Sequence, residues 1–225
     1  MGEIIEQVIF VSNYLNAKPT NIVVMGQGEP FLNFTNVIDA IDILNNSKLF
    51  NIGARKITVS TCGIISGINS FLKINKQYGL AISLHSAMQH KRDIIMPGVS
   101  NYSLKELKKS VIDYIKQTNR RVSFEYLMLR NFNDTEEDLK AMINFCKGLL
   151  CHINLIKLNS IDSSEFLPST NETINKWIAQ LNKSGIETTL RDSRGSDIDA
   201  ACGQLIHKQQ FVLLRQNHIK RQRRC

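Results

Sequence analysis

The sequence predicts an α/β protein with a parallel sheet. Short runs rich in β-branched residues alternate with longer segments of helical period about six times along the 225 residues. Strands that are separated by a helix usually run parallel, and their crossovers are right-handed. The chain is 43% hydrophobic and 21% charged, which is ordinary for a soluble globular protein and argues against disorder or a fibrous repeat. About six β/α units therefore imply one domain, either a doubly wound sheet or a β/α barrel.

Each expected strand is a short apolar run that lies next to a turn. The first, Asn21-Ile-Val-Val-Met25, is β-branched and is bounded by a Pro-Thr loop and a glycine. A barrel of this kind normally begins with a strand, so we expect an opening strand to be missing ahead of the first helix. The expected strands are residues 21–25, 56–60, 80–84, 122–129, 153–158 and 186–190.

The helices between these strands are expected from apolar residues at helical spacing and from capping residues. In the first helix, Ile4, Val8, Val11 and Leu15 lie on one face. Further helical faces are expected within residues 37–44, 64–72, 104–115, 139–146 and 177–181. The expected capping residues are Thr35 or Asn36 for the second helix, the capping box Ser103-Leu-Lys-Glu106, Asn133-Asp134 for a later helix, and Gly185 at the end of the last one.

The net charge of +8 is unevenly distributed along the chain. After Asp199 the sequence carries six Lys or Arg residues and no acid, so the preceding part is close to neutral. A basic tail suits a surface that meets a polyanion such as RNA, although a solvated basic end fits the charge equally well. No apolar run approaches the about 18 residues that span a bilayer, and the N-terminus does not resemble a signal peptide. We therefore expect a cytoplasmic protein without a membrane contact.

Small and polar residues gather where the expected strands end. In a parallel α/β fold the ligand site lies at these carboxyl ends. The glycines of Met25-Gly-Gln-Gly-Glu-Pro30 allow a ligand to approach the backbone, and Glu29 offers a carboxylate to a cationic group. Each segment alone is also compatible with a purely structural turn. The other segments are Ser60-Thr-Cys-Gly63, Ser83-Leu-His85 and Leu158-Asn159-Ser160.

The five cysteines do not form a recognisable framework. None are spaced as C-x-x-C, so the sequence offers no complete metal site. An odd count in a cytoplasmic chain also argues against a disulfide framework. Cys202 lies among small residues in Asp197-Ile-Asp-Ala-Ala-Cys-Gly-Gln-Leu205, after the last expected strand. Such a thiol is a candidate nucleophile if its pKa is lowered. The alternative is a small, buried apolar residue.

Several of these strings resemble the RlmN/Cfr family of radical S-adenosylmethionine (SAM) RNA methyltransferases. The most specific is Arg194-Gly-Ser-Asp-Ile-Asp-Ala-Ala-Cys-Gly-Gln-Leu205, and the matching region runs from residue 2 to about 205. The resemblance implies a partial (β/α)6 barrel that lacks its first strand and cluster loop, with residues 1–205 as the core and 206–225 as a basic tail. The other matching strings are Val24-Met-Gly-Gln-Gly-Glu-Pro30, Ser60-Thr-Cys-Gly63, Ser83-Leu-His85, Phe124-Glu-Tyr-Leu-Met128 and Ile153-Asn-Leu-Ile156.

The resemblance also implies an activity and a set of site residues. The family methylates an adenine of 23S ribosomal RNA, and in the RlmN branch also certain tRNAs. Cys202 corresponds to the cysteine that is methylated by one SAM; a radical made from a second SAM then removes a hydrogen from that methyl group, and the carbon adds to the adenine. The residues implied in SAM binding are Gly28, Glu29, Ser60, Ser83, Leu84, His85 and Asn159.

The sequence departs from the family in the residues that bind its 4Fe–4S cluster. The family motif C-x-x-x-C-x-x-C is absent here, as are its N-terminal accessory domain, its general-base glutamate and its second cysteine. We therefore expect no metal ligands in this chain, and no activity from the chain alone. A separately encoded N-terminal half could supply the cluster, which in the family takes electrons from an external reductant.

Two alternatives to the RlmN-type activity at carbon 2 stay open. One is the Cfr branch, which methylates carbon 8, although Gly28-Glu-Pro30 is more typical of RlmN. The other is a non-catalytic remnant of the family that binds SAM or RNA.

Overall fold

The structure is a computed structural model that describes residues 1–25, 28–158 and 166–191. Its centre is a six-stranded sheet in the order β1-β2-β3-β4-β5-β6, in which every pair is parallel. The strand order follows the chain without the reversal that defines a doubly wound sheet. The barrel alternative is therefore confirmed. The strands are β1 (Ile22–Val24), β2 (Ile57–Thr61), β3 (Gly79–Ser83), β4 (Val122–Met128), β5 (Cys151–Lys157) and β6 (Glu187–Arg191).

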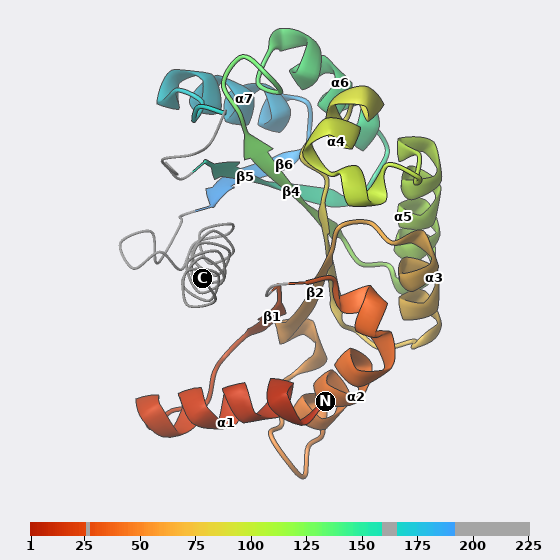
Figure 1. The fold of residues 1–225 in the computed structure, drawn as a ribbon, viewed down its shortest axis with the longest axis vertical. Helices are drawn as coiled ribbons and strands as arrows, with labels where there is room; N and C mark the ends of the chain where they lie inside the picture. The colour runs from red at the N-terminus through yellow and green to blue at the C-terminus, as the bar shows by residue number, and fades with distance from the viewer. Residues whose placement is uncertain (26–27, 159–165, 192–225) are drawn as a thin grey trace, which may run out of the picture.

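The helices cover the outer side of the curved sheet, as Figure 1 shows for α2, α3 and α5. All six predicted strands and all six predicted helices are present, most of them within a few residues of their expected bounds, although the last helix begins six residues earlier than its predicted apolar face. A seventh helix, α4, and the three 3-10 helices were not predicted. The helices are α1 (Gly2–Leu15), α2 (Phe34–Asn45), α3 (Ile65–Lys73), α4 (Gln89–Ile95), α5 (Leu104–Thr118), α6 (Glu136–Cys146) and α7 (Asn171–Lys183), with η1 (Pro30–Asn33), η2 (Ala54–Lys56) and η3 (Pro97–Val99).

Strand β4 shows how the two faces of the sheet differ. Val122, Phe124, Tyr126 and Met128 are fully buried and belong to the hydrophobic core between sheet and helices. Glu125 alternates with them and therefore faces the inner side of the curved sheet. The strand register continues this inner row through Ser83 on β3, Asn154 on β5 and Thr189 on β6. A polar row thus crosses the inner face.

Two helix caps differ from the prediction. Helix α2 is preceded by Asn33 rather than capped by Thr35 or Asn36, because the chain enters it directly from η1. Helix α6 is capped by Thr135, whose hydroxyl accepts a hydrogen bond from the Asp138 amide in a capping box. Asn133 and Asp134, the predicted caps of α6, make tertiary hydrogen bonds instead. The predicted capping box of α5, Ser103 with Glu106, is confirmed.

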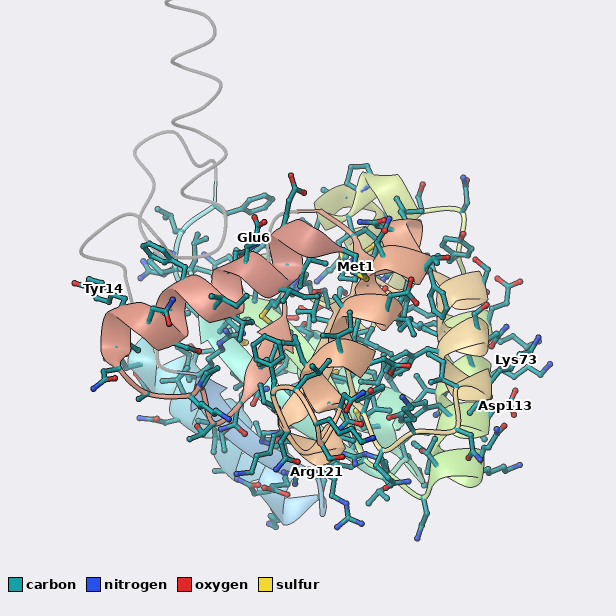
Figure 2. The ribbon with its side chains drawn as sticks, turned by 90° about the horizontal axis from the view of Figure 1, so that it is seen from below. Met1, Glu6, Tyr14, Lys73, Asp113 and Arg121 are labelled. Atoms are coloured by element: carbon teal, nitrogen blue, oxygen red, sulfur yellow. The ribbon has the colours of Figure 1, made fainter. Side chains whose placement is uncertain are left out.

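The first helix lies at the edge of the molecule and buries none of its residues. Of the predicted apolar face only Val8 packs against the core, while Leu15 is 61% exposed. Figure 2 shows the labelled Tyr14 at the far end of this helix, pointing away from the rest of the chain. Within the described ranges, no helix has the length and apolar character to cross a membrane.

Candidate functional site

Glu29 joins the loops that follow β1 and β2. Its Oε1 atom accepts a hydrogen bond of 3.0 Å from the Phe31 amide, and its Oε2 atom accepts one of 2.7 Å from the Cys62 amide. Pro30 has no N–H, so the Phe31 amide is the first that Glu29 can cap at the start of η1. A carboxylate has about four acceptor sites, and two remain after these bonds. Glu29 is thus fixed in orientation and retains capacity for a cationic ligand.

The loop after β2 approaches its neighbours closely. The Thr61 hydroxyl accepts hydrogen bonds from the amides of Gly63 and Ile64, which turns the chain. Gly63 has a φ of +102°, and a Cβ atom there would lie 3.1 Å from Nη2 of Arg92. That Nη2 atom donates a hydrogen bond of 2.6 Å to the Cys62 carbonyl. The positive φ therefore favours glycine at position 63, and the space for a larger side chain is tight. Ser60, one of the residues implied in SAM binding, is buried just ahead of this turn.

The described cysteines, Cys62, Cys146 and Cys151, differ in their surroundings. Burial, together with the neighbouring Glu29 carboxylate, raises the pKa of Cys62 to about 12, so its thiol stays protonated. Cys146 ends α6 and is buried, and Cys151 begins β5. A hydrogen bond from Cys146 to Cys151 raises the pKa of Cys146 and lowers that of Cys151. In the part of the chain that the structure describes, no three His, Cys, Asp or Glu side chains are grouped to hold a metal.

His85 is held firmly at the end of β3. Its backbone is left-handed, with φ +55°, and its amide donates to the Glu125 carbonyl. The Leu127 amide donates a 3.1 Å hydrogen bond to Nδ1 of the ring. Desolvation, with a smaller contribution from Arg92, lowers the pKa of His85 to about 4. At neutral pH the ring is therefore uncharged, and because Nδ1 is an acceptor, its proton is on Nε2.

The two residues before His85 differ in what they can present. Ser83 is partly exposed and lies beside Glu125 in the strand register. Leu84 is fully buried in the core, and its amide donates to the Glu125 carbonyl. Its side chain is therefore unsuited to direct ligand contact, so Leu84 could meet a ligand only through its backbone.

A polar network on the inner face was not foreseen from the sequence. The buried Glu125 carboxylate accepts a hydrogen bond of 2.8 Å from the side-chain amide of Asn154. Its other oxygen lies 3.4 Å from Nη1 of Arg191. The Thr189 hydroxyl donates to Asn154, so the hydrogen bonds converge on Glu125. Nη1 of Arg191 also lies 2.9 Å from the sulfur of Met25, at the end of β1. Arg191 thereby brings the carboxyl ends of the first and last strands together across the sheet.

Asn133 is a second residue that the sequence did not mark as part of the site. It is fully buried, and its side chain donates to the carbonyls of His85 and Leu127 while accepting from the Leu129 amide. It therefore ties the loop after β3 to the end of β4. The predicted residues Asn159 and Cys202, and the basic tail, lie outside the described residues.

Comparisons with known proteins identify relatives of the chain. No family model matches the chain. The chain is 43% identical over 204 residues to the probable dual-specificity RNA methyltransferase RlmN of Clostridium perfringens, a match that covers 91% of this chain and 59% of that protein. It is 44% identical over 212 residues to the corresponding protein of Chlorobium phaeobacteroides, covering 92% and 58%. The chain belongs to the RlmN family. It spans about 59% of the length of the curated relatives that it matches.

Solved structures support the same family and fold. A radical SAM methyltransferase from Sphaerobacter thermophilus superposes with a TM-score of 0.86 at 38% identity, covering 90% of this chain and 60% of that one. A domain of a pyruvate-formate lyase-activating enzyme from Bacteroides vulgatus has a TM-score of 0.57 at 17% identity, covering 77% and 100%, and shows the fold alone. The curved sheet of this RlmN-family chain is thus the radical SAM partial barrel, which confirms the fold implied by the resemblance.

Proposed function

We propose that this chain forms the SAM-binding and methyl-carrying part of an RlmN-type RNA methyltransferase. The substrates would be carbon 2 of an adenine in 23S rRNA and in certain tRNAs, in the cytoplasm. The observation that carries the proposal is the Glu29 carboxylate, held by the loops after β1 and β2 at the carboxyl ends of the strands. In a chain of this family, that is where a carboxylate would receive the ammonium group of SAM.

The described residues fit SAM in their chemistry. SAM carries an ammonium group, a carboxylate, a ribose and an adenine. Glu29 would bind the ammonium group beside Gly28, whose backbone has a φ of +97°. The hydroxyls of Ser60 and Ser83 are suited to the carboxylate or ribose. Neutral His85 offers an Nε2–H donor. Leu84, through its backbone, and Asn159 complete the proposed set.

Cys202 is proposed as the residue that carries the methyl group to the adenine. Within the described residues, no ligand set fits a 4Fe–4S cluster, and the sequence contains no C-x-x-x-C-x-x-C motif. In the family this cluster, when bound, supplies the electron that cleaves SAM. We therefore propose that the cluster and its reductant are provided from outside the residues of this chain, and that the chain alone is inactive.

A chimera tests the activity. Residues 2–205 would replace the corresponding segment of the full-length Clostridium perfringens relative, and the hybrid would be expressed in bacteria that lack the endogenous enzyme. Mass spectrometry of rRNA nucleosides should detect 2-methyladenosine, and Cys202→Ala in the hybrid should abolish it. Methylation at carbon 8 would transfer the chain to the Cfr type. A folded hybrid that binds SAM without methylating either carbon would support the non-catalytic alternative.

The basic tail has a separate test. If residues 206–225 contact phosphates, then removing residues 216–225 should weaken rRNA-fragment binding and flatten its dependence on salt. Equal affinities across salt concentrations would show that the tail does not contribute.

A further inference from the structure

Arg92 is a buried cation beside the candidate SAM site. It lies on α4 with only 1% of its surface exposed. Its Nη2 atom donates to the Cys62 carbonyl, whereas its Nε atom is buried and has no hydrogen-bond partner in the described part of the chain. Burying a guanidinium with so few acceptors is unfavourable, so a structural role for stability alone is a weak explanation.

Residue Cys62 is held from both sides. Its N–H donates a hydrogen bond of 2.7 Å to the Glu29 carboxylate, and its carbonyl accepts one of 2.6 Å from the Arg92 guanidinium. The Glu29 carboxylate and the Arg92 guanidinium thus hold the two peptide groups on either side of the Cys62 α-carbon. Both contacts are charge-assisted, which makes them shorter and stronger than neutral hydrogen bonds. Arg92 and Glu29 are therefore linked through the backbone of a single residue.

The neighbouring residues keep Arg92 in place. Lys91 pairs with the buried Asp138 carboxylate at 2.8 Å, so α4 is also anchored to α6. Gly63 leaves room for Nη2, because a Cβ atom at this position would come within 3.1 Å of it. An arginine suits this site because its planar fork reaches the carbonyl with a fixed direction, which a lysine ammonium does not provide.

We propose that Arg92 is a positioning residue for Glu29, acting through the Cys62 peptides. The role that this gives to SAM binding rests on the proposed function, whereas the mechanical link between Arg92 and Glu29 does not. Arg92 does not itself need to touch the ligand. Its loss would let the loop of residues 61–63 move and would leave the Glu29 carboxylate free to turn away from the ammonium group.

Amide hydrogen exchange of the whole chain, followed by NMR, tests the link without any ligand. In Arg92→Met, the Cys62 amide should exchange about tenfold faster, in line with the loss of one charge-assisted hydrogen bond, while the amide of Val59 in β2 should be unchanged. The control His90→Ala, an exposed position on the same helix, should alter neither amide. Glu29→Gln should also accelerate exchange of the Cys62 amide. In the double variant, Arg92→Met with Glu29→Gln, this amide should exchange no faster than in Glu29→Gln alone.

Two results would overturn the link. One is an unchanged Cys62 amide in Arg92→Met, and the other is equal acceleration of Cys62 and Val59, which would mean general destabilisation. If Arg92→Met does not fold, the same comparison in Arg92→Lys decides, with a smaller acceleration at Cys62 expected.

Equilibrium dialysis with radiolabelled SAM measures the consequence for the ligand. Arg92→Met should raise the Kd about tenfold, Arg92→Lys should recover part of the loss, and His90→Ala should bind as the unmodified chain does. An unmodified chain that does not bind SAM would contradict the proposed function, and the exchange experiment would still decide the role of Arg92. Equal Kd values with accelerated exchange at Cys62 would refute the role in SAM binding.

Discussion

The neutral His85 ring should make the stability of the chain depend on pH. Its pKa falls from 6.5 to about 4 on folding, because the ring is desolvated and lies near Arg92. Between these values the unfolded chain binds a proton that the folded chain does not, so stability is lost as pH falls below about 6.5. From pH 7.5 to pH 5.0 this one group should remove about 2 kcal/mol from the free energy of unfolding.

The control is the variant His85→Asn, which lacks the titrating imidazole. The Asn Oδ1 atom can replace Nδ1 as the acceptor for the Leu127 amide, and asparagine tolerates the left-handed backbone at this position. Urea unfolding at both pH values would give the pH-dependent loss in each protein. His152, whose pKa burial also lowers, contributes equally to both and cancels in the difference. The unmodified chain should lose about 2 kcal/mol more than the variant. Equal losses would refute a neutral His85 in the folded chain.

Three further stability predictions follow from packing and capping, each measured by urea unfolding at pH 7.5. Gly67→Ala should cost about 1–3 kcal/mol, because its Cβ would lie 2.4 Å from Cβ of Phe31, whereas Gly53→Ala, in open space, should stay within about 0.5 kcal/mol. Ser103→Ala should cost about 1 kcal/mol through the lost capping box of α5. Asn133→Ala should cost about 3 kcal/mol or more, since three backbone groups lose their partner; a loss under about 1 kcal/mol would mean that water replaces the amide.

The strands were predictable because most are short runs rich in apolar or β-branched residues, and in β2, β4 and β5 the core-facing residues are fully buried. The barrel could not be separated from a doubly wound sheet by the same signals, since both consist of β/α units and differ only in strand order. Helix α4 was missed because its sequence, Gln89-His-Lys-Arg-Asp-Ile-Ile95, is short, mostly polar and shows no apolar stripe. It forms because Lys91 and Arg92 find partners far away in the sequence.

The candidate site was predictable as far as the geometry of a parallel sheet determines it. Residues at strand ends meet at one edge, and Glu29 and Cys62 do so through a hydrogen bond. The residues that reach the site from other elements could not be predicted from the sequence. Asn133 has the local pattern of a helix cap, but its amide is used by the loop after β3. Glu125 stands out only as a charge within an apolar strand, and its partners depend on the register of β5 and β6.

The order of the strands also bears on how this chain is made. Each strand pairs only with those that precede or follow it in sequence, at separations of one β/α unit. As the polypeptide leaves the ribosome, every new unit meets an edge that is already formed, and no early strand has to wait for a distant partner. A destabilising substitution in β2 or α3 should therefore impair the pairing of every later strand, because it removes the sheet edge on which they assemble. A destabilising substitution in β6 should leave the first five strands able to assemble.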